Sequence, residues 1–122
     1  MLSPELLMGI AGEIFDPPIT DKGVQEALAF AVEQYNQDRR DSPNYFKVVR
    51  VMMAQSQVET WVNYSLLTQL VKTTCEKIAS WKPTYQYIQK CKRLPGKKEK
   101  PNCFFKVRQV LSKMELTVTS CK

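Results

Sequence analysis

The sequence predicts an α+β fold in which one long helix packs across an antiparallel sheet of four to five strands. Two features carry this prediction. Apolar residues between Val24 and Tyr35 recur at helical spacing, and after Pro43 the pattern changes to runs of aromatic and β-branched residues. A chain of 122 residues suits one hydrophobic core. We therefore expect a flexible N-terminal segment at 1–11 and one folded domain at 12–122.

The predicted helix begins after Thr20 or Asp21, because either side chain can cap the first free backbone N–H groups. It ends near Asp38, where a polar run begins. The proline pair at 17–18 excludes a helix before this point, and residues 14–15 are expected to form a short edge strand. The apolar face of the helix consists of Val24, Ala27, Leu28, Ala31 and Tyr35.

Two predicted hairpins make up the sheet. The first joins strands at 45–54 and 61–71 and turns near Glu59, and the second joins strands at 104–111 and 116–119. Between the hairpins, the aromatic residues of segment 76–101 form a short helix or pack locally. The strand after the first turn alternates as a half-buried strand does, with Val62, Tyr64, Leu66 and Leu70 on one face and Asn63, Ser65 and Gln69 on the other.

The composition excludes several classes of protein. The apolar fraction of 43% and the charged fraction of 25% are those of a soluble globular domain, and no apolar run approaches the ~20 residues that span a bilayer. Histidine is absent, and the chain has no glycine-rich phosphate loop and no nucleophile beside a base. We therefore expect no enzyme, no metal site and no cofactor. The first five residues lack the features of a signal peptide, so we expect Met1 to replace one that was removed.

Four cysteines lie in the C-terminal half, at Cys75, Cys91, Cys103 and Cys121. No pair has the Cys-x-x-Cys spacing of a zinc or redox site. An even number of such cysteines favours two disulfides in a secreted, extracellular protein. The spacing alone leaves all three connectivities open.

A basic loop precedes the second hairpin. Against one acidic residue, Glu99, it holds six cations, and the whole chain carries a net charge of +6. One interpretation is a solvated loop. The other is an anion-binding surface for sulfated glycans, a microbial envelope or acidic proteins, acting in defence. Nucleic acid is not expected as a partner, because no aromatic residue lies among the cations Lys90, Lys92, Arg93, Lys97, Lys98 and Lys100.

A Tyr35-Asn36 pair stands at the expected end of the helix, and further motifs follow at 48–51, 62–64, 73–75 and 102–105. In this order the motifs resemble those of the type 2 cystatins, a family of secreted cysteine-protease inhibitors. The resemblance covers about residues 12–121. It implies a cystatin-like fold and, from the order of the cysteines, the pairs Cys75–Cys91 and Cys103–Cys121.

Cystatins block papain-like proteases with a wedge of three segments. The resemblance places a glycine of the first segment at Gly12 and the Gln-x-Val-x-Gly hairpin motif at residues 57–61. It places the Pro-Trp pair of the second hairpin at Leu111 and Ser112, in a loop shortened by two residues. The protease-contact candidates are therefore Gly12, Gln57, Val58, Glu59, Thr60, Trp61, Leu111 and Ser112.

The wedge departs from the family pattern at two positions of the first hairpin. Glu59 replaces Val, and burying an unpaired carboxylate costs several kcal/mol. Trp61 replaces a glycine, and a Trp at positive φ would lose about 1–2 kcal/mol. Because about 1.4 kcal/mol changes affinity tenfold, we expect inhibition of papain-like proteases to be weak or lost. The legumain-binding motif Ser-Asn-Asp is not reproduced at 39–41 or 42–44.

In lacking the hairpin glycine and the Pro-Trp pair, the sequence resembles the reproductive-tract branch of the family, the cystatin-related epididymal and testicular proteins. Trp61 is expected either to anchor a different target or to pack back on the sheet. Asn63 begins an Asn-Tyr-Ser glycosylation sequon, which can go unused inside a paired strand. The long, β-prone hairpin also permits a self-assembling protein, in which a monomer exchanges strands to form a domain-swapped dimer or an amyloid-like assembly.

Overall fold

The computed structural model describes residues 12–96 and 100–122. The expected flexible segment at 1–11 and two basic-loop residues, Lys97 and Lys98, lie outside the described residues. Within the described part, no helix is long and apolar enough to cross a membrane. The elements, in order, are β1 (Ile14–Phe15), α2 (Lys22–Asp38), β2 (Asn44–Val58), β3 (Val62–Glu76), α3 (Tyr85–Lys90), β4 (Asn102–Val110) and β5 (Lys113–Cys121).

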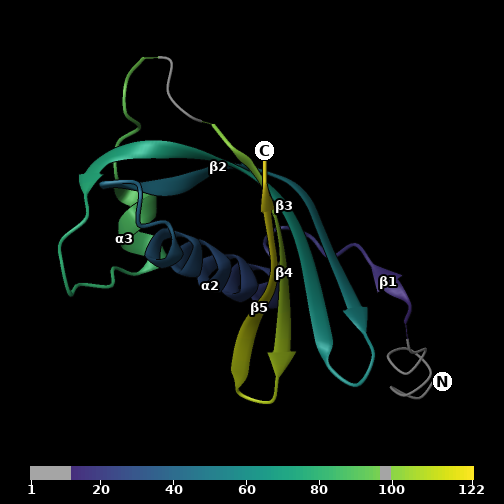
Figure 1. Cartoon of the computed structure of the whole chain (residues 1–122). Helices are drawn as coiled ribbons and strands as arrows, with labels where there is room; N and C mark the ends of the chain where they lie inside the picture. The colour runs from purple at the N-terminus through teal and green to yellow at the C-terminus, as the bar shows by residue number, and fades with distance from the viewer. Residues whose placement is uncertain (1–11, 97–99) are drawn as a thin grey trace.

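The five strands form one antiparallel sheet in the order β1-β2-β3-β4-β5. Figure 1 shows the sheet curving around α2, which lies across its concave face. Pairing of β2 with β3 is irregular at three places between Asn44 and Met53, and such bulges bend and twist a strand. The predicted α+β class, with a helix across a sheet of up to five strands, is confirmed.

Helix α2 begins as its sequence predicts. The Asp21 carboxylate accepts a hydrogen bond of 3.1 Å from the backbone N–H of Val24, which caps the first turn. All five predicted apolar positions of the helix are buried. They pack against the inner face of the sheet, where the fully buried side chains include Phe46, Leu66, Leu70, Phe105 and Val107.

A glycine near the start of α2 allows the helix to approach the sheet closely. A Cβ atom on Gly23 would overlap the Tyr64 hydroxyl and lie 2.9 Å from the Cζ atom of the same ring. Burial of this tyrosine, with the nearby carboxylates of Asp21 and Glu26, raises the pKa of its hydroxyl above the usual value. The contact therefore places Tyr64 of β3 against the N-terminal turn of α2.

The close contact predicts an unusual response to alanine. Gly→Ala in a helix normally stabilises by about 0.5–1 kcal/mol. At Gly23 we expect it instead to lower the free energy of unfolding by about 1–3 kcal/mol, because Tyr64 must move out of its packed position. Urea unfolding of Gly23→Ala measures the loss, which a Tyr64→Phe background should reduce. Lys22→Ala on the exposed face is the control, and an equal stabilisation by both changes would contradict the contact.

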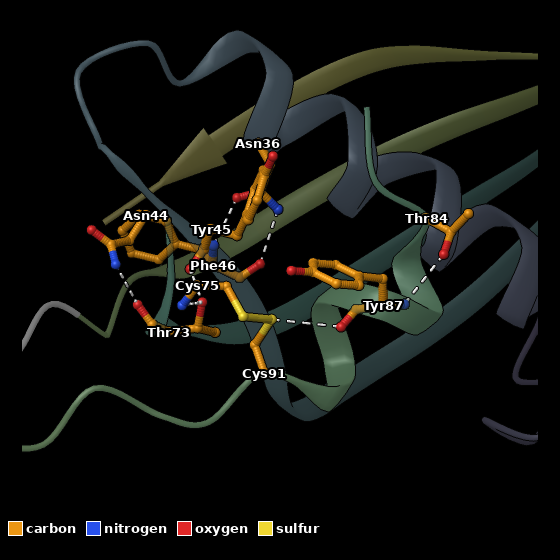
Figure 2. The surroundings of a disulfide bond; sticks show 9 residues. All are labelled: Asn36, Asn44, Tyr45, Phe46, Thr73, Cys75, Thr84, Tyr87 and Cys91. Carbon is orange, nitrogen blue, oxygen red and sulfur yellow. Dashed lines mark hydrogen bonds between the residues drawn. A yellow bond between two sulfur atoms is a disulfide. The ribbon is translucent and has the colours of Figure 1, made fainter. Parts of the chain in front are cut away.

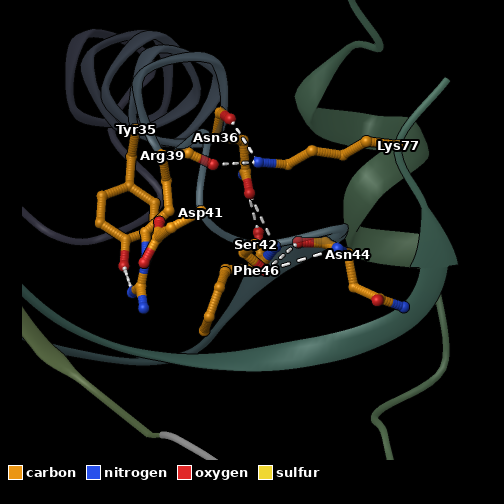
Figure 3. A network of polar contacts seen from close by, with 8 residues as sticks. All are labelled: Tyr35, Asn36, Arg39, Asp41, Ser42, Asn44, Phe46 and Lys77. Carbon is orange, nitrogen blue, oxygen red and sulfur yellow. Dashed lines mark hydrogen bonds and ion pairs between the residues drawn. The ribbon is translucent and has the colours of Figure 1, made fainter. Parts of the chain in front are cut away.

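Asn36, at the C-terminal end of α2, joins the helix to β2. Its side-chain amide donates to the carbonyl oxygens of Val32 at 3.0 Å and Phe46 at 2.9 Å. Its amide oxygen accepts from the backbone N–H of Phe46 at 2.7 Å (Figure 3). The residue is 3% exposed. Both backbone groups of Phe46 thus bond to one side chain, as they would to a neighbouring strand.

A second amide repeats this arrangement two residues further along β2. Gln89 of α3 accepts from the Val48 N–H at 2.7 Å and donates to the Val48 carbonyl at 3.0 Å. β1 pairs with β2 only at Gln57 and Ser56, near the other end of the strand. The two amides therefore close part of an edge that would otherwise present unpaired backbone groups to another chain.

The two disulfides form in the expected sequential pairing. Cys75–Cys91 attaches the end of α3 to the end of β3, with 5.9 Å between the Cα atoms (Figure 2). Cys103 and Cys121 lie opposite each other on β4 and β5, with 4.1 Å between their Cα atoms. The first bond holds α3, and with it Gln89, beside β2.

Candidate functional site

The segment before β1 is fastened to the tip of the first hairpin. The Gly12 N–H donates to the Val58 carbonyl at 2.9 Å, and the Gln57 side-chain amide donates to the Gly12 carbonyl at 2.8 Å. Gly12 has a φ of +84°, a conformation that glycine adopts without strain. Gln57 thus holds the N-terminal segment through its side chain, a positioning role that sequence reasoning did not assign to it.

The second hairpin lies beside the first. Val62, the first residue of β3, pairs with Gln109 near the end of β4. This register brings the turn at 59–61 next to the turn at 111–112, and Figure 1 shows both hairpins pointing the same way. The structure therefore brings all three predicted wedge segments to one end of the sheet. We call the eight residues Gly12, Gln57, Val58, Glu59, Thr60, Trp61, Leu111 and Ser112 the wedge edge.

The tip of the first hairpin does not need a glycine. Val58 pairs with Val62, and the Glu59 N–H donates to the Trp61 carbonyl at 3.0 Å. Among the described residues other than glycine, only Ser80 and Leu111 have positive φ. The prediction of backbone strain at Trp61 was therefore wrong, because Trp61 has a negative φ in the closed turn. Glu59 and Thr60 are exposed, and Trp61 is 37% exposed, which leaves part of its ring available for contact.

The second hairpin carries the strain instead. Val110 pairs with Lys113, so Leu111 and Ser112 form a two-residue turn. Leu111 has a φ of 55°, and positive φ at the first of two turn residues is the type II′ pattern, which favours glycine. Proline, with φ fixed near −65°, cannot adopt this conformation. The turn thus differs in backbone as well as in side chain from one that begins with Pro-Trp. The Leu111 side chain is 84% exposed.

Because Leu111 is both strained and exposed, we expect one substitution there to change stability and binding in opposite directions. We expect Leu111→Gly to raise the free energy of unfolding by about 1 kcal/mol, because glycine relieves the positive-φ strain. We expect the same change to weaken protease binding, because it removes an exposed apolar side chain from the wedge edge. Urea unfolding and inhibition titration measure the two effects. Ser112→Gly is the matched control and should not stabilise. A stabilised Leu111→Gly variant with unchanged binding would remove Leu111 from the site.

Asn63, the first residue of the sequon, lies on the central strand β3, one residue after that strand begins at the first hairpin turn. It pairs with Gln57 on one side and with Arg108 on the other. A glycan at this position would stand close to the wedge edge. Occupancy of the sequon stays a prediction.

The segment after α2 is used internally. Arg39 bonds to Asp41 at 3.0 Å and to the Tyr35 hydroxyl at 2.6 Å, and its guanidinium lies 4.8 Å from the centre of the Phe46 ring (Figure 3). The hydrogen bond from Arg39, assisted by its charge, lowers the pKa of Asp41, although burial acts in the opposite direction. Ser42 is buried. These contacts hold the segment where the family's Ser-Asn-Asp motif is expected but not found.

Part of the basic loop runs alongside β3. Thr73 forms a bridge with Arg93, the Thr74 N–H donates to the Lys92 carbonyl, and the Leu94 N–H donates to the Lys72 carbonyl. These bonds give residues 92–94 an extended conformation beside Lys72.

Comparison with known proteins identifies the family of this chain. The family model for the cystatin domain matches residues 12–112, from the glycine beside Gln57 to the second turn. The chain belongs to the cystatin family. Cystatin-1 of the snake Crotalus adamanteus is 41% identical over 125 residues, covering 99% of this chain and 89% of the relative. A cystatin of Naja kaouthia is 42% identical over 124 residues, covering 99% and 86%.

Solved cystatin structures share the fold. Dimeric human cystatin F superposes with a TM-score of 0.76 at 24% identity, covering 92% of this chain and 87% of that chain. Mialostatin, a gut cystatin from the tick Ixodes ricinus, gives a TM-score of 0.70 at 17% identity, covering 90% and 97%. At these identities the likeness shows the cystatin fold alone. The placement in the reproductive-tract branch stays a prediction.

Proposed function

We propose that this chain is a secreted cystatin that binds papain-like cysteine proteases through the wedge edge, with an affinity below that of a cystatin with an unmodified wedge. The main support is the pair of hydrogen bonds between Gly12 and the first hairpin, at 2.9 and 2.8 Å. Together with the pairing of Val62 and Gln109, they align three segments before any partner arrives. A preformed edge avoids ordering costs on binding.

The side chains on this edge explain the reduced affinity. Glu59 stands exposed at the tip, so its carboxylate must lose water on entering a protease cleft. The second turn offers Leu111 rather than a large aromatic ring, and aromatic anchors often dominate binding energy. Trp61 supplies the aromatic surface in its place, from the first hairpin.

Titration of the disulfide-intact protein against papain, cathepsin L and legumain tests this function. We expect papain and cathepsin L to be bound at micromolar rather than nanomolar levels, and legumain not to be inhibited. Trp61→Ala and Leu111→Ala should each weaken binding to papain, whereas Lys113→Ala, beside the second turn, should not. Nanomolar inhibition would refute the argument from Glu59. No binding to any of the three proteases would refute the proposed partner class.

A second candidate function is anion binding by the basic loop. The ordered segment at 92–94 favours it, because the bonds to β3 place Lys92 and Arg93 next to Lys72 instead of leaving them on a free loop. A sulfated glycan is the expected ligand. Binding to heparin should fall steeply with salt and should weaken in a Lys92→Ala, Arg93→Ala variant. Heparin binding that changes neither with salt nor in the double variant would mean that the loop is only a solvated surface.

We propose the monomer as the working form. The first hairpin has no residue at positive φ between Val58 and Val62, so opening it would not relieve strain of that kind. The second turn does hold strain, at Leu111, but it joins strands whose ends are linked by Cys103–Cys121. Strand exchange between two molecules would therefore relieve little backbone strain at either tip, although the hairpins are long.

A further inference from the structure

A cavity of about 360 Å³ lies away from the wedge edge and shares no residue with it. Its lining comes mainly from the C-terminal part of α2 and from the segment that joins β3 to α3. Figure 1 shows the course of these two segments. Its apolar lining includes Tyr45, Trp81 and the fully buried Ile88. Cavities that bind small molecules commonly start at about 300 Å³, so this one has room for a ring and a short chain.

The walls of the cavity are tied together by several contacts. Lys77 donates hydrogen bonds to the carbonyls of Asn36 and Arg39 at the end of α2 (Figure 3). Glu33 of α2 accepts a bond of 2.7 Å from the Tyr85 N–H at the start of α3. The Cys75–Cys91 disulfide closes the segment between these two points. The cavity is therefore built into the fold before a ligand binds.

One residue on its rim is placed by a strained turn. Ser80 has a φ of 67°, which few non-glycine residues adopt, and the next residue is Trp81. The indole contacts the ring of Tyr87 edge to face, with 4.8 Å between ring centres, yet Trp81 remains 42% exposed. Strain of this kind is often found where a side chain serves binding. Here it holds a large aromatic surface at the mouth of an apolar cavity.

The charge around the cavity is mainly positive. Arg40, Lys77 and Lys82 line it, against one carboxylate, Glu33, which already accepts the Tyr85 N–H. Within the described part of the chain, no carboxylate forms an ion pair with Arg40 or Lys82. Burial lowers the pKa of Lys77, which is consistent with a cation that lacks water on one side.

We propose that this cavity binds an aromatic carboxylate, with the ring against Trp81 and Tyr45 and the carboxylate between Arg40 and Lys82. The apolar lining accounts for the ring, and the two cations without acidic partners account for the single negative charge. Such a group occurs in a free small molecule and at the C-terminal residue of a peptide. The site is independent of protease binding.

Titration of the ¹⁵N-labelled full chain with indole-3-propionate, followed by NMR, tests the proposal. We expect saturable shifts of the amide signals of Trp81 and Ile88 and no saturable shifts at the wedge edge. The neutral amide, indole-3-propionamide, should bind at least tenfold more weakly. An Arg40→Gln, Lys82→Gln variant should bind the acid at least tenfold more weakly. Both residues are exposed, so the variant should fold as the wild type does.

Lys22→Gln and Lys113→Gln remove exposed cations elsewhere and should leave binding unchanged. N-acetylalanyl-phenylalanine with a free or an amidated C-terminus distinguishes the two sources. Tighter binding of the free-acid peptide than of indole-3-propionate indicates a protein C-terminus, and the reverse indicates a small molecule. The proposal fails if no ligand gives saturable shifts around the cavity. It also fails if acid and amide bind equally, or if the double variant binds the acid as the wild type does.

Discussion

Replacing Asn36 with alanine is expected to lower the free energy of unfolding by about 3 kcal/mol, because the change leaves the N–H and C=O of Phe46 buried without partners. Each orphaned group costs about 1–3 kcal/mol. A domain of this size is stable by only about 5–15 kcal/mol. The loss should therefore be visible as a shift of about 10 °C in Tm and as a lower midpoint in urea.

Gln34→Ala is the matched control for this prediction. It removes a side-chain amide from the same helix, but its bond of 3.0 Å to Asp38 is exposed. We expect a change of about 0.5 kcal/mol or less. Gln89→Ala should lie between the two, because Gln89 bonds Val48 in the same way as Asn36 bonds Phe46 but is only partly buried. Equal, small losses in all three variants would show that side-chain amides do not hold this edge of β2.

Removing the charge of Glu59 is expected to strengthen binding to papain at least tenfold. The carboxylate stands at the exposed tip of the first hairpin and must be desolvated in a protease cleft. Tenfold corresponds to about 1.4 kcal/mol, which is less than the cost of burying an unpaired charge. Inhibition titration of Glu59→Val and Glu59→Gln measures the gain. A gain in both variants assigns the effect to charge, and a gain in Glu59→Val alone assigns it to the fit of the side chain.

Two further variants make this experiment decisive. Glu76→Gln removes an exposed carboxylate at the far end of β3 and should leave binding unchanged. Trp61→Gly should not improve binding, because Trp61 is already at negative φ and glycine would only remove aromatic surface. If Trp61→Gly improves binding and Glu59→Val does not, steric bulk rather than charge limits binding to papain.

The helix and both hairpins could be predicted from local pattern. Asp21 caps α2 as expected, and Asp38 ends it, because capping and apolar spacing act within a few residues of sequence. The turn near Glu59 was also predicted correctly. In contrast, β2 and β3 each extend to 15 residues, and the bulges in β2 interrupt the alternation that would have revealed this length.

Features that depend on distant residues could not be predicted. The sign of φ at Trp61 and at Leu111 follows from how each turn closes its hairpin. The family pattern, with glycine at the first tip and Pro-Trp at the second, points to the opposite signs. The amide of Gln89 reaches Val48, 41 positions away in sequence, because a disulfide and tertiary contacts hold α3 beside β2. The cavity beside Trp81 is formed by segments from α2, β2 and the 77–88 region. None of these features produces a periodic pattern in the sequence.

Because of where the disulfides lie, proteolytic cleavage has different consequences at the two hairpin tips. Leu111 lies within the loop closed by Cys103–Cys121, so a nick there leaves both new ends covalently attached. The first tip, at 59–61, lies outside both disulfide loops. A nick there divides the chain into two pieces joined only by β-sheet pairing and core contacts. A protease that cleaves the first tip can therefore separate the protein into two pieces, whereas one that cleaves the second tip leaves both pieces joined by a disulfide.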